Sequence, residues 1–371
     1  MPLSSEDSLR LHVLANQQVM AIRIDESAMI LTALTDKGEA TIALHPDVRH
    51  EAYLKQVREF LSEQYLGMPG GYPVHISRWS RAGHARNSID KMLLLGEPEA
   101  IIAASRSGNM TAKLAACVWW AQQSTEIACG LLGNDSVVQD SLGVELAGFL
   151  LEFMPFEESS LSVVESVRLC LQGNVLGTEQ KSLLWRRAAR KNIYYAGFLL
   201  AGSAVIPLQE DAHAELAETR RSLSRCVVKN NCFADVFLRF LEAPGRQWLS
   251  TLLLALRKPA EQDIVTALFV ALQQHVGARL DLGVVSDCEI ASENAQAWLD
   301  GKGQNVELLK MASCLQPDMM CRFEALLVLA QLGEETLTPI FSGRDSSGSV
   351  MRKHLQPLTD SIAENVTALM R

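Results

Sequence analysis

The sequence contains no Cys-x-x-Cys pair, the spacing on which zinc ribbons and thioredoxin-like redox sites depend. Both classes of protein are therefore excluded. Eight cysteines are nevertheless present, at positions 117, 129, 170, 226, 232, 288, 314 and 321. Most stand in apolar helical surroundings such as LAACVWW, where a cysteine is typical of a small buried side chain. We expect free thiols and no disulfide framework.

Long hydrophobic runs are also missing. VELAGFLLEFMPF, residues 144–156, falls short of the roughly 20 residues of a membrane-spanning helix and is interrupted by Glu145 and Glu152. The stretch MPLSSEDSLRLHVL places acids where a signal peptide carries positive charge. The sequence therefore predicts a cytoplasmic protein without membrane insertion.

Positive charge is in deficit. There are 34 lysines and arginines against 43 acidic residues, which gives a formal net charge of −9. A field of that sign repels polyanions at long range, so DNA, RNA and anionic membranes are disfavoured as partners. Hydrophobic residues make up 48% and charged residues 21%, a balance typical of a folded chain with a large core.

Signatures of catalysis and cofactor binding are lacking as well. No HExxH, GxSxG, GxGxxG or GxxxxGK[ST] pattern occurs. His45 and His50 are five positions apart with Pro46 between them, which does not suit two metal ligands on one helical face. The sequence predicts no catalytic residue, no metal site and no cofactor.

Two kinds of hydrophobic periodicity divide the chain. Residues 19–44 alternate in the manner of strands, with turn residues at 25–27 and 35–38, and residues 45–67 carry a helical stripe. From about residue 88, apolar helical segments follow one another without a convincing strand. We predict a mainly α protein, with a small N-terminal antiparallel β meander plus helix in 1–87. An all-helical domain of stacked helical hairpins, either an α-solenoid or an irregular helical bundle, then occupies 88–371.

The strongest candidate for a binding surface is LLWRRAARKNIYYAGFLL, residues 183–200. On a helix its four cations fall within about 140° of arc, and its aromatic residues adjoin them. Arginine and aromatic side chains of this kind form anchors at interfaces. The candidate partner-binding or anion-binding residues are Trp185, Arg186, Arg187, Arg190, Lys191, Tyr194 and Tyr195.

Two weaker candidates accompany this stretch. Arg221, Arg225 and Lys229 form a second basic stripe, and Arg78 and Arg81 lie in a glycine-rich segment at 67–86. Either group can bind phosphate in principle. Alternatively, all of these cations have a structural role. Cations stabilise the C-terminal ends of helices, and arginines form ion pairs with carboxylates on neighbouring helices.

Several strings resemble the DsrS family of sulfur-oxidising bacteria: LSSEDSLRL at 3–11, AIRIDES at 21–27, LTDKGEA at 34–40, PGGYPV at 69–74, LLLGEPEA at 93–100, and the basic stretch itself. The resemblance runs through roughly the first 200 residues and is patchier afterwards. It implies a cytoplasmic accessory or regulatory protein encoded beside reverse dissimilatory sulfite reductase, without a known cofactor or catalytic residue. No functional residue is carried over.

Three hypotheses for function follow. The first is an accessory or regulatory protein that binds a protein partner and influences expression of the sulfur-oxidation machinery. The second is a nucleic-acid-binding control factor, which requires the two basic stripes to converge on one face. The third is an enzyme or sulfur carrier with a reactive cysteine, for which Cys226 beside Arg225 and Lys229 is the best candidate.

The missing ligand spacings and nucleotide loops generate a prediction about composition. Purified protein should be colourless and should contain no stoichiometric metal, because no stretch supplies a ligand set. Elemental analysis and an absorption spectrum measure both properties. A metal at one equivalent per chain, or a visible chromophore, would contradict it.

Overall fold

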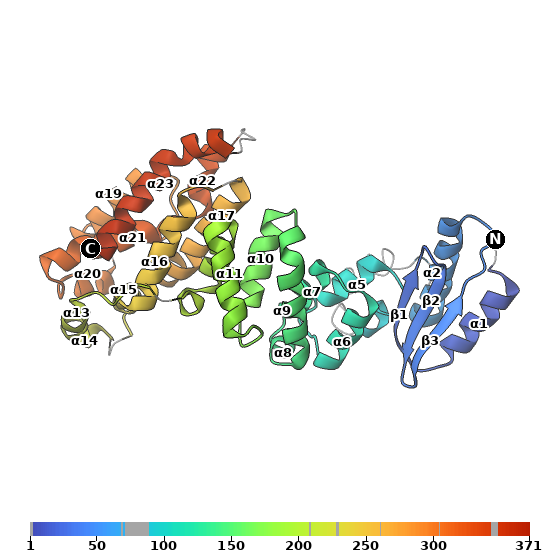
Figure 1. Cartoon of the computed structure of the whole chain (residues 1–371). Helices are drawn as coiled ribbons and strands as arrows, with labels where there is room; N and C mark the ends of the chain where they lie inside the picture. Colours follow the sequence, from blue (N-terminus) through green and yellow to red (C-terminus); the bar gives the residue numbers. More distant parts are fainter. Residues whose placement is uncertain are drawn as a thin grey trace. The chain divides into compact units, whose positions relative to one another are not determined.

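A computed structural model describes residues 3–67, 70, 89–207, 209–227, 230–259, 261–303, 305–342 and 348–371 (Figure 1). The chain forms two compact units. Unit 1 comprises Met1–Pro155 with Gly173–Leu176, and unit 2 comprises Phe156–Gln172 with Gly177–Arg371. The predicted mainly α fold with a small N-terminal antiparallel sheet is confirmed. The boundary expected after residue 87 falls outside the described residues.

The sheet of unit 1 is a three-stranded meander in the order β1-β2-β3. Its strands are β1 (Val19–Asp25), β2 (Ile30–Thr35) and β3 (Gly38–Ala43), and both neighbouring pairs are antiparallel. The second turn joins Thr35 to Gly38, whose φ of 117° favours glycine. The turns that the sequence predicts at 25–27 and 35–38 therefore lie where the strands reverse.

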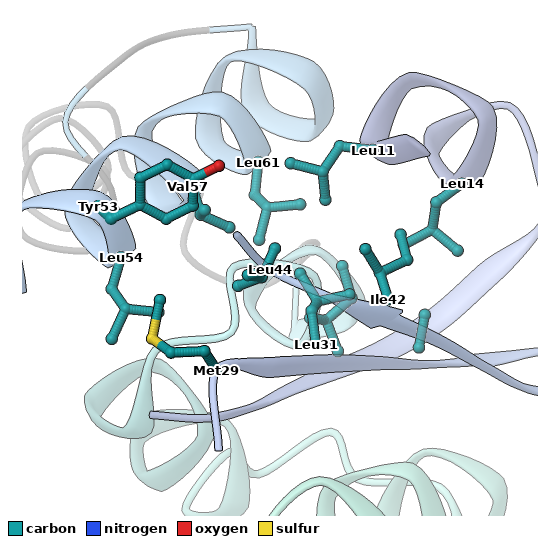
Figure 2. Packing of buried hydrophobic residues seen from close by; sticks show 12 residues of the cluster. Leu11, Leu14, Met29, Leu31, Ile42, Leu44, Tyr53, Leu54, Val57 and Leu61 are labelled. Carbon is teal, nitrogen blue, oxygen red and sulfur yellow. The ribbon is translucent and has the colours of Figure 1, made fainter. Parts of the chain in front are cut away.

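Two helices, α1 (Ser5–Ala15) and α2 (His50–Leu66), pack on one face of this sheet (Figure 2). Alternate strand residues such as Ile22, Leu31 and Ile42 point toward them, and all three are buried. Because strand side chains alternate between faces, one set of apolar residues is enough to form this core. Helix α2 ends at Gly67, whose φ of 69° is left-handed.

The opposite face of the sheet carries polar residues that contact a helix from later in the chain. Trp120 of α6 (Ala112–Ala121) donates a hydrogen bond from Nε1 to Glu39 Oε1 over 2.7 Å. The guanidinium of Arg23 lies 4.5 Å from the centre of the Trp120 ring and forms a salt bridge with Glu39. The free edge of β1 is also covered, since Ile22 N–H donates to Leu93 O. These contacts join the sheet to the helices that complete unit 1.

The remaining helices of unit 1 are short and follow one another closely. Those that the structure describes are α4 (Ile89–Met92), α5 (Pro98–Ser105), α7 (Thr125–Leu132), α8 (Asp135–Val138) and α9 (Ser141–Phe153), and the 3₁₀ turn η1 (Met154–Phe156) spans the boundary with unit 2. Side chains cap the N-termini of two of these helices. The Ser124 hydroxyl accepts a hydrogen bond from Ile127 N–H, and the Asp140 carboxylate accepts one from Leu142 N–H. Alternate helices pack together, α5 on α7 and α7 on α9.

Unit 2 is helical in all of its described regular elements. They are α10 (Ser160–Cys170), α11 (Thr178–Arg190), α12 (Ile193–Ala201), η2 (Ser203–Val205), α13 (Leu216–Ser222), α14 (Ser224–Val227), α15 (Cys232–Leu241), α16 (Ala243–Leu256), α17 (Gln262–Leu272), the π-helix η3 (Gln273–Gly277), α18 (Ala278–Leu280), α19 (Cys288–Leu299), α20 (Val306–Ala312), α21 (Pro317–Ala330), α22 (Glu334–Phe341) and α23 (Gly348–Met370).

The centre of one part of unit 2 is α12, which is apolar on every side and buried from Ile193 to Leu199. A helix without a polar face must be enclosed. Four helices enclose it: α10, α11, α16 and α17. Gly197 permits the closest approach, since a Cβ there would lie 2.5 Å from Val167 Cβ of α10.

Within the described ranges, we find no helix with the length and apolar character that crossing a bilayer requires.

A buried carboxylate ties α1 to the sheet and to α2. Asp7 is fully buried, and its carboxylate accepts hydrogen bonds from His45 N–H over 2.7 Å and from the Tyr53 hydroxyl over 2.5 Å. His45 Nδ1 lies 3.2 Å from the same carboxylate. Burial alone would raise the pKa of Asp7, but these hydrogen bonds and the charge of His45 together hold that pKa below its ordinary value.

The Asp7 contacts predict a pH-dependent contribution to stability. Asp7→Asn should lower the free energy of unfolding by about 2 kcal/mol at pH 7, because it removes a charged acceptor from buried donors. Since the folded-state pKa is lowered, the difference from wild type should be complete above about pH 5 and shrink below about pH 4. Chemical denaturation at several pH values measures this difference.

Asp36, which is exposed in the β2–β3 turn, provides the control. Asp36→Asn should change the free energy of unfolding by less than about 0.5 kcal/mol. A cost of Asp7→Asn that stayed constant between about pH 7 and about pH 3 would contradict the assignment of an ionised, hydrogen-bonded carboxylate.

Candidate functional site

Helix α11 carries the basic stretch that the sequence singles out. It begins after Gly177, whose N–H donates to Gln180 Oε1 over 3.0 Å, and its last turn contains Arg187 and Arg190. Cations are favoured there by the negative end of the helix dipole. The helix ends at Arg190, and Lys191 adopts an extended conformation with φ −131° and ψ 103°. The three arginines therefore share a helical face, whereas Lys191 lies beyond it.

The aromatic residues of the stretch are mostly part of the core. Tyr194 is 3% and Tyr195 9% exposed, because both belong to the enclosed helix α12. Trp185 is half-buried and packs edge-on against Tyr195 and Phe198, with ring centres 5.2 and 5.0 Å apart. Trp185, Tyr194 and Tyr195 therefore pack α11 against α12, and none of these three rings is exposed for a ligand to stack on.

Arg187 also has a structural contact. Its side chain hydrogen-bonds to the Tyr194 hydroxyl. Burial raises the pKa of Tyr194 and outweighs the opposing effect of the Arg187 charge and hydrogen bond, so the phenol stays protonated at neutral pH. Of the four cations of the stretch, Arg186, Arg190 and Lys191 are exposed.

Arg190 and Lys191 line a cavity of about 660 Å³ within unit 2. Arg257 and Lys258, which follow the end of α16, line the same cavity and are also exposed. The two pairs are far apart in the chain but meet in space, because α11 and α16 both pack on α12. The cavity therefore gathers four cations, and among the described residues that line it Glu261 is the single carboxylate.

A second cavity of about 490 Å³ adjoins the first, since Arg257 and Pro259 line both. Arg352 and Lys353 of α23 contribute two further cations, and Asp360 contributes a carboxylate. Arg352 Nη1 donates to Pro259 O over 3.2 Å, which fixes α23 beside the end of α16. We call the set Arg190, Lys191, Arg257, Lys258, Arg352 and Lys353 the basic surface.

Four of these six residues carry no functional signal in the sequence. Arg257 and Lys258 stand in LLLALRKP, where two cations follow an apolar helix and precede a proline. That pattern is typical of an ordinary helix C-terminus. Arg352 and Lys353 stand in MRKH, a short basic cluster that by itself indicates no binding site. Only packing shows that the three pairs of cations line two cavities that share Arg257 and Pro259.

Of the weaker candidates, only Arg221 has a described side chain, and it lies outside the basic surface. Arg221 is exposed on α13, which packs on α15, and it lines neither of the two cavities. Lys229, Arg78 and Arg81 lie outside the described residues, as does the side chain of Arg225.

The cysteine that the sequence singles out is buried, and the described part of the chain holds no group of metal-ligating side chains. The thiol of Cys226 is buried, with 8% of the residue exposed, so a sulfur-bearing partner has little access to it. No cluster of three or more His, Cys, Asp or Glu side chains suited to a metal ion occurs among the residues described.

Comparisons with protein-family models, curated proteins and solved structures find no match to this chain. The resemblance to the DsrS family therefore stays a prediction.

The exposure of Arg190 and Lys258 predicts that these two residues of the basic surface contribute little to stability. Arg190→Ala and Lys258→Ala should each change the free energy of unfolding by less than about 0.5 kcal/mol, since neither forms a salt bridge in the described structure. Gly197→Ala should cost about 2 kcal/mol, because its Cβ would collide with Val167. Urea unfolding compares the three variants. A loss above about 1 kcal/mol in Arg190→Ala or Lys258→Ala would assign these cations a structural role instead of a binding role.

Proposed function

We propose that this chain is an accessory protein of dissimilatory sulfur oxidation that acts in the cytoplasm by binding an acidic protein partner. Through that partner it influences production of the sulfur-oxidation proteins. The sulfur-oxidation context rests on the resemblance in the sequence. The binding role rests on one observation: six basic side chains from three separate segments line two cavities that share Arg257 and Pro259, in a chain whose net charge is −9.

The charge pattern supports a protein partner over nucleic acid. The overall negative charge repels a polyanion at a distance, while the local basic surface attracts a limited acidic segment at short range. Glu261 and Asp360 interrupt the basic surface, which suits a partner with mixed charge. Trp185 and Tyr195 pack against one another and do not form a stacking platform for bases.

Affinity capture from sulfide-grown cells tests the proposal. The wild-type protein should retain a partner with an acidic surface after nuclease treatment. Reversing four charges, with Arg190→Glu, Lys191→Glu, Arg257→Glu and Lys258→Glu, should reduce its recovery at least about tenfold, because like charges then face each other. The same variant should lower the levels of the sulfur-oxidation proteins.

A matched control distinguishes the effect of the basic surface from the effect of a change in net charge. The exposed lysines at 37, 55, 113 and 310 line neither cavity, and their replacement by glutamate changes the net charge equally. This control should capture the partner as wild type does. Equal losses in both variants, or a partner recovered only when nucleic acid is intact, would overturn the proposal.

A further inference from the structure

The larger cavity concentrates positive charge that no described contact neutralises. Arg190, Lys191, Arg257 and Lys258 line it, and none of them forms a salt bridge within the described structure. Like charges held close together repel one another, and a bound anion relieves that repulsion. The lining is therefore electrostatically suited to a ligand with more than one negative charge.

Helix ends add to this positive potential. Helices α10 and α12 begin in the lining at Ser160 and Ile193, and Glu261 is the N-cap residue of α17. The N-terminus of a helix carries a partial positive charge and favours anions. The negative ends of α11 and α16 also reach the cavity, but each of these ends carries two of the four cations.

The rest of the lining is largely apolar and leaves room for more than an inorganic ion. Leu254, Ile264, Pro259 and Tyr195 contribute to it. A volume of about 660 Å³ falls within the range of about 300–1,000 Å³ that is usual for small-molecule sites. The cavity thus combines a charged part with an apolar wall.

We propose that this cavity binds a small organic phosphate. Arg190, Arg257 and the two lysines contact the phosphate oxygens, and the organic part lies against Leu254 and Ile264. Guanidinium groups bind phosphate oxygens in bidentate pairs, and a phosphate group offers more negative charge and more acceptor oxygens than a single carboxylate. This inference goes beyond the proposed function, because it requires no macromolecular partner.

Isothermal titration calorimetry of the purified full chain, at about 150 mM salt to screen weak surface attraction, tests the inference. ADP should bind saturably at one site per chain, and inorganic pyrophosphate should bind more weakly, because it lacks an organic part to contact the apolar wall. Arg190→Ala and Arg257→Ala should each weaken ADP binding at least about tenfold. Glu261→Gln should strengthen it, because the variant removes the one carboxylate among the described lining residues.

Two controls make the result specific. Lys310→Ala removes an exposed cation of unit 2 that lines neither cavity, so ADP binding should stay within about twofold of wild type. Citrate should bind at least about tenfold more weakly than ADP, because it has no apolar part to contact Leu254 and Ile264. Absence of ADP binding, equal binding of citrate, or an equal loss in Lys310→Ala would overturn the inference. Partner capture is measured separately, so either proposal can fail alone.

Discussion

The enclosure of α12 is the constraint on which the architecture around the candidate site depends. Its sequence, IYYAGFLLA, offers no polar face, so water must be excluded from its whole circumference. Helices α10, α11, α16 and α17 supply that cover. Because they surround a short helix, the end of α11, the end of α16 and the beginnings of α10 and α17 meet around one cavity.

The same packing gives the residues of the basic stretch different roles. Tyr194 and Tyr195 are committed to the core, and Trp185 and Arg187 hold α11 against them. Arg190 and Lys191 remain exposed in the lining of the cavity. Arg187, which holds α11 against α12, and Arg190, which is exposed in the cavity, are therefore only three positions apart in the sequence.

Local periodicity is enough to predict the meander, its two turns, the helix that ends at Gly67 and the helical character of the remainder. Helix α1 is not among these predictions. Its buried residue Asp7 is charged, and the sequence around Asp7 does not indicate that Tyr53 and His45 donate hydrogen bonds to its carboxylate. For the candidate site, the sequence indicates Arg190 and Lys191, but it offers no reason to join them to residues such as Arg257.

The sequence by itself determined the three strands, the helix that ends before Gly67 and the helical character of the later segments, because these properties depend on neighbours within a few residues. Only the tertiary structure decided which helices meet. Hydrophobic attraction is nondirectional, so many pairings would bury the same faces, and close fits such as that of Gly197 against Val167 select among them. The meeting of cations from three distant segments is a consequence of that selection.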